Sequence, residues 1–502
     1  MLLEYFRQVV HAGSWPILAL LYGAGGAYAG MLARGMAVAG HIVCAVCLYR
    51  ILRRPLLTRH LSPWAASIYL LSPYYFARGL MELSVFDVFI FLYLLSILLL
   101  RQRRRLFHVL AFVAFLISLS VETLVFLEPL RLVFVHRPRQ ALRRSILRVS
   151  PFWTAAGVLL VARVLWLTPS GHYAGYNKIS MSIIDLLWNW GRHGWYYVKG
   201  AGFMLHNAVR MISLPGLLLL FAAFAALLLA SRSSVTKGVR GNAMHARALL
   251  FGVLLAALGA LPYALAGRVP TTQMFESRFA YVSIPGISIA AAAVAAMIPC
   301  RFCRALMRGC LLIVLGLSSL FVGKWYMYDW VVQRDLARQL HRALADVTTP
   351  SLYRLKMTPS STNVLFLGRA FSAEDLNVPL NLLRPAEFPL VFVYDDNYFA
   401  SPWAFPDGMC TITTNDRYPR PASCIDLEYR LNSNAASVDH MSFADLLRSG
   451  RGSPPPEPFL GVLTSGRVGS SGGENDTPKS RRAGGDVVNR MLHVVPDFEG
   501  HR

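Results

Sequence analysis

The sequence predicts an α-helical polytopic membrane protein with about ten transmembrane helices, a small extracytoplasmic α/β domain and a disordered C-terminal tail. Hydrophobic residues make up 55% of the 502 residues, whereas only 15% are charged. Apolar runs of about 20 residues, the length that crosses about 30 Å of hydrocarbon, recur along the first two-thirds of the chain. The alternating segments of about ten residues that build a membrane β-barrel are absent, so we expect the spans to be helices.

The basic residues are grouped in the way that sets membrane topology. The net charge is +23, from 50 Lys and Arg against 27 Asp and Glu, which in a soluble protein would suggest a nucleic-acid partner. Here the arginines gather between apolar runs, at residues 50–59, 101–105, 137–148, 232–247 and 301–308. Successive clusters are separated by two predicted spans, as the positive-inside rule requires. We therefore expect a multi-pass cell (inner) membrane protein with these clusters in the cytoplasm, and no nucleic-acid partner.

The first half of the chain is predicted to form a series of hairpins. Residues 1–13 are a polar and aromatic approach to the membrane without the features of a signal peptide, and the glycine-rich run 15–33 is a weak span. Regular spans are expected at residues 36–52, 64–76, 85–100, 106–119, 123–135 and 152–167. Asp87, Glu122 and Glu128 lie at helix mouths on the predicted outer side. Such an acid is often a satisfied structural group, but three in an acid-poor chain mark a candidate polar site.

Residues 168–207 form the longest predicted outward loop between spans, and they are rich in Trp, Tyr and His. Two interpretations are open. One is an amphipathic interfacial helix that carries an aromatic belt. The other is a lid whose aromatic faces and hydrogen-bonding groups, Trp195 and His193 among them, bind a sugar ring beside a lipid head group. The two interpretations are compatible with each other.

A short polar link, residues 268–286, joins the apolar runs 248–266 and 281–297. It places Glu276 and Arg278 at the mouth of a membrane helix, where charge is costly. One interpretation is an arginine that snorkels to the lipid head groups. The other is a site for an anionic ligand such as a lipid phosphate.

Changes of composition divide the chain into a transmembrane domain (residues 1–325), an extracytoplasmic domain (326–448) and a low-complexity tail (449–502). The transmembrane domain contains further predicted crossings at residues 208–230 and 311–322. In the tail Gly, Ser, Pro and Arg dominate, and a segment of this composition cannot bury a core.

The extracytoplasmic domain is expected to combine helix and strand. Leucines at four-residue spacing from Leu336 to Leu344 predict an amphipathic helix over residues 331–347. Residues 363–368 and 389–394 are short β-type runs bounded by turn formers. We therefore expect a small α/β fold on the outer side of the membrane.

The spacing of the cysteines and the absence of several known motifs argue against a metal site and against several classes of enzyme. Cys300 and Cys303 have the Cys-x-x-Cys spacing but neither a second pair nor a nearby His, so no metal site is expected. Cys410 and Cys424 would close a small loop in an oxidising compartment, and reduction would then change the mobility of the purified protein on a gel. Phosphate-binding loops, zinc-protease motifs and serine-esterase motifs are absent, and the sequence leaves the identity of any cofactor unknown.

Four short landmarks occur along the chain in a definite order. They are Tyr5-Phe6-Arg7-Gln8 with Tyr49-Arg50-Ile51-Leu52-Arg53-Arg54, Asp87 with Phe91, Ser120-Val121-Glu122-Thr123 with Pro129, and Glu276-Ser277-Arg278-Phe279-Ala280-Tyr281. Together they resemble the C superfamily of integral-membrane glycosyltransferases, in the branch near protein O-mannosyltransferases and related enzymes of lipid-linked sugars. The resemblance covers roughly residues 5–325.

This resemblance implies an inverting transfer of a sugar from a polyprenyl-phosphate donor to a glycan or protein acceptor on the extracytoplasmic membrane face. A carboxylate takes the proton of the acceptor hydroxyl while a cation holds the departing lipid phosphate. The candidate catalytic residues are Glu4, Asp87 and Glu122, and the candidate substrate-binding residues are Arg7, Arg278, Glu276, Trp195 and His193. Arg278 is the candidate for the phosphate, and the expected partners are the donor lipid, the acceptor and membrane lipids.

The chain departs from the family pattern at its start. Family members place the general base in an outer loop that precedes the segment matching residues 5–8, and here only Glu4 lies near. Gln8 stands where proline is usual, and Val121 replaces a lysine. These departures fit either a chain that lacks the first helix and its acidic loop, or one that has lost the base and is inactive. A transporter or flippase of lipid-linked intermediates and an inactive membrane scaffold are the alternative functions.

Overall fold

The computed structural model divides into two compact units, residues 1–322 (unit 1) and residues 323–502 (unit 2), and each is described by itself. The described residues are 29–53, 59–72, 86–136, 142–165, 182–210, isolated positions between 218 and 225, 242–270, 276–344, 351–358, 391–395, 424–431 and 461–465.

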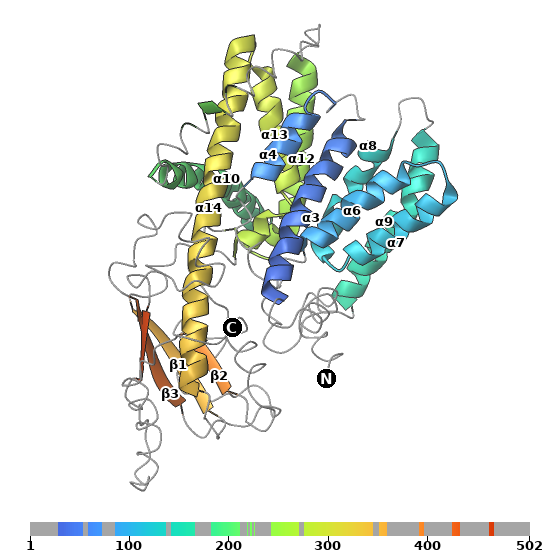
Figure 1. Ribbon diagram of the computed structural model, residues 1–502. Coiled ribbons are helices and arrows are strands. Elements are labelled where there is room, and N and C mark those ends of the chain that lie inside the picture. The colour runs from blue at the N-terminus through green and yellow to red at the C-terminus, as the bar shows by residue number, and fades with distance from the viewer. Residues whose placement is uncertain are drawn as a thin grey trace, which may run out of the picture. The chain divides into compact units, whose positions relative to one another are not determined.

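Unit 1 is helical in its described part (Figure 1). Its α-helices are α3 (Ala29–Leu52), α4 (Ser62–Leu71), α6 (Phe86–Leu100), α7 (Arg105–Ser118), α8 (Arg131–Val135), α9 (Leu142–Leu165), α10 (Ile183–Arg210), α12 (Asn242–Leu265), α13 (Ile284–Met297) and the first part of α14 (Arg301–Leu344). Two 3-10 helices, η3 (Glu122–Leu130) and η5 (Glu276–Ala280), lie between them. In Figure 1, α10 runs across the direction of α12 and α13.

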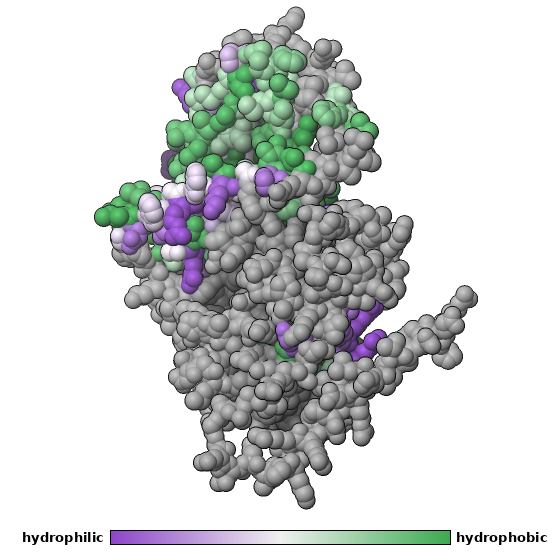
Figure 2. Space-filling model, turned by 90° about the vertical axis from the view of Figure 1, so that its left-hand side faces the viewer, coloured by the Kyte–Doolittle hydropathy of each residue, from purple (hydrophilic) through white to green (hydrophobic). Residues whose placement is uncertain are grey.

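Four helices of the described chain are long and apolar enough to cross a membrane. Their qualifying stretches are Gly35–Leu52, Leu142–Ala162, Ala243–Leu265 and Phe302–Lys324. The shorter helix α7 exposes an apolar row that includes Leu106, Val109, Val113 and Leu116. Hydrophobic atoms also cover much of the coloured upper surface in Figure 2. An apolar surface of this extent is typical of a protein surrounded by lipid, and the total of about ten spans stays a prediction.

Two predicted elements differ from the observed ones. The sequence predicts one helical span over residues 123–135, but the chain forms η3 and the short α8 there. Pro129 lies inside η3, and because proline lacks an N–H and its ring clashes with the preceding turn, it destabilises an α-helix at this position. Within the predicted outward loop at residues 168–207, residues 183–207 belong to the helix α10, which continues to Arg210.

Helices α12 and α13 approach each other through residues that have little or no side chain. A Cβ atom added at Gly286 would lie 2.3 Å from the backbone nitrogen of Ala256, and one added at Gly252 would lie 2.6 Å from that of Ala290. Small residues spaced in this way let membrane helices pack backbone to backbone. The contact fixes the start of α13, where the polar link between the two helices ends.

Unit 2 contains the second part of α14 and four strands. Leu336, Leu340 and Leu344 are all buried, as their four-residue spacing predicts. Strands β1 (Ser351–Thr358), β2 (Val391–Asp395), β3 (Cys424–Leu431) and β4 (Gly461–Ser465) form one sheet of order β2-β1-β3-β4. The β1 strand pairs in parallel with β2 and β3, and β4 is antiparallel to β3.

The sheet matches the sequence-based expectations only in part. Residues 391–395 overlap the predicted run 389–394, whereas the other predicted run, 363–368, lies outside the described residues. The β4 strand departs from the expectation of an unstructured tail after residue 449, because its apolar Val462 and Leu463 pair with β3. Cys410 also lies outside the described residues, so the proposed disulfide and the extracytoplasmic α/β domain stay predictions.

Candidate functional site

Tyr281, between η5 and α13, is the point where several separate segments of unit 1 meet. Its side chain is 2% exposed, and its hydroxyl lies 3.0 Å from Oγ1 of Thr123. The Tyr263 hydroxyl donates to the same Oγ1 at 3.3 Å, and the ring of Phe86 stacks on Tyr281 with 5.3 Å between centroids. We call these four residues the Tyr281 cluster. It joins the first turns of α6 and η3 to the last turn of α12 and the start of α13.

The amphipathic helix α10 holds both ends of the polar link. Nε2 of His193 donates to the backbone oxygen of Arg268 at 2.9 Å, and the hydroxyl of Tyr197 donates to that of Ala280 at 3.1 Å. One turn earlier, the amide of Asn189 donates to the backbone oxygen of Ala264 at 3.0 Å. These three residues recur at four-residue spacing and share one helix face. The link is thus tied to α10 at both ends.

The opposite face of α10 is apolar and exposed. It consists of Ile184, Leu187, Trp188, Trp195, Val198 and Val209, each more than half exposed. Exposed Arg192 and Lys199 lie along one border of this face. An exposed apolar face bordered by cations is typical of a helix that lies in the plane of the membrane interface. This arrangement favours the interfacial interpretation of residues 168–207.

The predicted site residues fall into three groups in the structure. Asp87 and Glu122 each adjoin a member of the Tyr281 cluster, in the first turn of α6 and of η3. Glu276 and Arg278 lie in η5, the segment that leads to Tyr281, and only their backbone is described. Glu4 and Arg7 lie outside the described residues.

Of the predicted site residues, Asp87 and His193 are buried, whereas Trp195 is exposed. Asp87 is fully buried, with its Oδ1 3.6 Å from Nδ1 of His41 on α3. Its Cβ lies 3.1 Å from where a Cβ on Gly40 would be, so the two helices are in close contact there. By contrast Trp195 is 63% exposed whereas His193 is 2% exposed. Residues two apart on a helix point in opposite directions, so the structure does not bring these two together.

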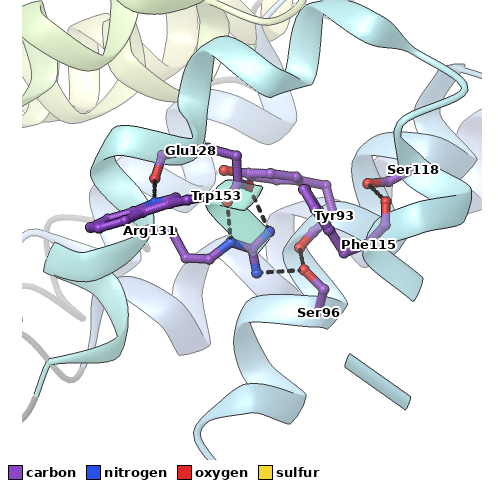
Figure 3. A network of polar contacts seen from close by, with 7 residues as sticks. All are labelled: Tyr93, Ser96, Phe115, Ser118, Glu128, Arg131 and Trp153. Atoms are coloured by element: carbon purple, nitrogen blue, oxygen red, sulfur yellow. Dashed lines mark hydrogen bonds and ion pairs between the residues drawn. The ribbon is translucent and has the colours of Figure 1, made fainter. Parts of the chain in front are cut away.

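Sequence reasoning missed a buried ion pair formed by the third of the predicted outer acids. Both oxygens of the Glu128 carboxylate accept hydrogen bonds from the Arg131 guanidinium, at 2.7 and 2.8 Å. Nη1 of Arg131 donates to Oγ of Ser96 at 2.9 Å, and Nε1 of Trp153 donates to the backbone oxygen of Glu128 (Figure 3). The guanidinium also lies 4.4 Å from the ring centroid of Phe152. Glu128 is therefore a structural residue, and its i,i+3 spacing to Arg131 was the available signal.

Cavities occur in the described part of unit 1. A cavity of about 480 Å³ is lined by Tyr49, Arg50, Arg53, Leu98, Arg101 and Gln102. The buried Arg101 donates to the backbone oxygens of Ile51 and Phe134, so its charge offsets the negative ends of α3 and α8. A smaller cavity of about 30 Å³ lies beside Tyr281, with room for about one water molecule.

Chemically, the site offers hydroxyl groups and carboxylates next to a segment that carries Arg278. Thr123, Tyr263 and Glu122 are half-buried, so these three side chains can hydrogen-bond a polyhydroxylated ligand, whereas Tyr281 is buried behind them. No group of three or more His, Cys, Asp or Glu side chains that could hold a metal ion occurs in the described part of the chain. Comparison with known protein families, with curated proteins and with solved structures finds no match.

The buried His193 makes a pH dependence of stability predictable. Burial lowers its pKa to about 4, and the hydrogen bond to Arg268 offsets only part of that effect. Because the unfolded chain binds this proton near pH 6.5, the stabilising contribution is complete above pH 6.5 and is lost as the pH falls from there to about 4. We expect the unfolding midpoint of the purified protein to fall over this range.

The variant His193→Gln tests this prediction, because a glutamine amide can still donate to the backbone oxygen of Arg268 but does not titrate. Thermal unfolding in detergent at pH 8, 6 and 4.5 should show a shallower pH dependence in the variant than in the wild type. Equal slopes would show that His193 is not the group that titrates.

Proposed function

We propose that this protein is a glycosyltransferase that moves a sugar from a polyprenyl-phosphate donor to an acceptor on the extracytoplasmic face of the membrane. The observation that supports it is the Tyr281 cluster. This cluster connects the first turns of α6 and η3, which carry Asp87 and Glu122, with Tyr281. Tyr281 directly follows η5, which carries Glu276 and Arg278. These segments are the ones that resemble the glycosyltransferase motifs, and they are up to 195 residues apart in the sequence.

The proposed reaction is an inverting displacement at the anomeric carbon. The acceptor hydroxyl oxygen attacks this carbon while the bond to the phosphate oxygen breaks, and the lipid phosphate leaves with the electron pair. Glu122, half-buried in the first turn of η3, takes the hydroxyl proton as general base. Arg278 binds the departing phosphate as a charge-assisted, bidentate partner. Asp87 is fully buried against α3, and its role is to hold the start of α6 next to Tyr281.

The first test separates donor binding from transfer. Purified full-length protein in liposomes is titrated with a polyprenyl phosphate, which lacks the unknown sugar, and transfer is then followed with radiolabelled polyprenyl-phosphomannose and other polyprenyl-phosphate sugars. We expect Arg278→Ala to weaken binding of the polyprenyl phosphate by about tenfold or more. Glu122→Gln should keep binding and lose transfer.

Arg192→Ala is the matched control, because Arg192 is exposed on α10 and its removal subtracts the same charge. Donor binding that is equal in Arg278→Ala and Arg192→Ala would contradict the role given to Arg278. Movement of the donor lipid across the bilayer without sugar transfer would instead favour a flippase.

A further inference from the structure

A second polar cluster lies at the other end of α12, far from Tyr281. Nε2 of His60, in the turn before α4, lies 2.9 Å from Nδ1 of His245 in the first turn of α12. The two rings are tilted, with 4.7 Å between centroids. A hydrogen bond between two imidazoles needs one nitrogen without a proton, so the pair does not carry two positive charges in this arrangement. His245 and Tyr263 are eighteen residues apart on α12 and hence about 27 Å apart along its axis.

Two arginines from the first turns of α14 complete this cluster. Nε and Nη2 of Arg304 donate to the backbone oxygens of Ile298 and Pro299, which fixes the guanidinium at the end of α13 without neutralising it. The guanidinium of Arg308 lies 4.7 Å from the ring centroid of Trp64 on α4. Its Nε is buried and has no hydrogen-bond partner within the part of the chain that the structure describes.

The charges of this cluster are not balanced by acids. Among the described residues, no carboxylate forms an ion pair with His60, His245, Arg304 or Arg308. Burial lowers the pKa of His60 to about 4, and the charges of His245, Arg308 and Arg304 act in the same direction. The site therefore holds an excess of positive potential that an anion would relieve.

Helix dipoles add to this potential. Helices α4, α12 and α14 begin at Ser62, Asn242 and Arg301, so three helices have their N-terminal ends at the cluster, against the single C-terminal end of α13 that Arg304 contacts. Figure 1 shows that α12 and α14 start at the same end of unit 1. Free N–H groups and the positive end of the macrodipole favour a phosphate at such a place. The basic segments around these residues are also the ones that the charge pattern assigns to the cytoplasm.

We propose that His60, His245, Arg304 and Arg308 form a binding site for a phosphate group at the cytoplasmic end of the helices, separate from the proposed glycosyl-transfer site. The arginines donate charge-assisted hydrogen bonds to the phosphate oxygens. The phosphate belongs either to the head group of an anionic lipid, as in basic pockets between membrane helices, or to a soluble phosphate compound. A bound anion also favours the protonated form of His60, so binding takes up a proton and strengthens as the pH falls toward 4.

The experiment measures binding to the purified full-length protein in detergent. One arm titrates inorganic phosphate against chloride at constant ionic strength, and the other titrates phosphatidylglycerol against phosphatidylcholine, with the thermal unfolding midpoint as the readout. We expect the unfolding midpoint to rise with phosphate or with phosphatidylglycerol. The rise with phosphatidylglycerol should be larger at pH 6 than at pH 8, and the pH comparison uses this arm because its phosphodiester keeps a single charge over that range whereas inorganic phosphate takes up a proton. A response to phosphatidylglycerol alone identifies a lipid head group, and a response to inorganic phosphate identifies a site open to soluble phosphates.

Four variants locate the site. The double variant Arg304→Gln/Arg308→Gln should lower the affinity by about a hundredfold. His60→Gln should bind at pH 8 but lose the gain at pH 6, a change that a loss of folding would not produce. Arg144→Gln, an exposed charge on α9, and Arg53→Gln, at the 480 Å³ cavity, should bind as the wild type does. No response to either ligand would overturn the proposal, as would a loss of binding in Arg53→Gln but not in the double variant.

Discussion

Replacing Glu128 with glutamine will lower the free energy of unfolding by about 3–5 kcal/mol, because it leaves the buried charge of Arg131 without its counter-ion. Arg131 is 0% exposed and Glu128 is 2% exposed, so water cannot solvate the remaining guanidinium. A glutamine oxygen can accept one hydrogen bond but carries no charge, and its amide nitrogen faces an N–H donor. Unfolding of the purified protein in mixed micelles by a denaturing detergent measures the change.

A double replacement provides the control for this prediction. Glu128→Leu combined with Arg131→Met removes both charges and keeps much of the side-chain volume, so it should recover most of the lost stability. The methionine can also keep contact with the ring of Phe152, which now lies 4.4 Å from the guanidinium. If the double variant is as unstable as Glu128→Gln, the loss comes from packing rather than from the unpaired charge.

The same pair shows what the sequence could and could not predict. Hydropathy and charge patterning predicted that Glu128 lies within an apolar segment near a helix end, because these patterns depend only on neighbouring residues. They predicted that Glu128 belongs to a polar site on the outer side. In the structure Glu128 forms an ion pair with Arg131, whose guanidinium lies against the aromatic rings of Tyr93, Phe115 and Phe152. The 3-10 geometry around Pro129 changes which residues share a face, and α-helical periodicity does not account for that change.

The candidate site was predictable in its parts but not in its assembly. Separate motifs marked the segments of Asp87, Glu122 and Arg278. Tyr263 carries no sequence signal, and Thr123 lies in the Ser120–Thr123 landmark without being marked as a site residue, because the importance of both comes from a long-range contact with Tyr281. Likewise, the three predicted cytoplasmic segments that supply His60, His245, Arg304 and Arg308 meet only because the turn before α4 contacts the start of α12 and the start of α14 contacts α4.

Replacing Gly286 with alanine will destabilise the protein by about 3 kcal/mol, the upper end of the usual cost of overpacking. The added Cβ would lie 2.3 Å from the nitrogen of Ala256 and 2.7 Å from the oxygen of Gly252. Both are backbone atoms of α12, so no side chain can rotate away and the two helices must move apart. Gly157→Ala is the matched control, since a Cβ there meets nothing within 4 Å and alanine is the better helix former by about 1 kcal/mol.

The same substitution should also affect the proposed donor site, because Tyr263 on α12 and Tyr281, three residues before α13, both contact Thr123. If separation of the helices breaks the hydrogen bonds at 3.0 and 3.3 Å, polyprenyl-phosphate binding will weaken in Gly286→Ala at a temperature where the protein remains folded. Tyr281→Phe removes the hydroxyl without adding volume, and it should weaken donor binding with a smaller loss of stability. If Gly286→Ala unfolds more easily yet binds the donor lipid like Gly157→Ala, the helix contact supports the fold alone and the Tyr281 cluster is not part of the site.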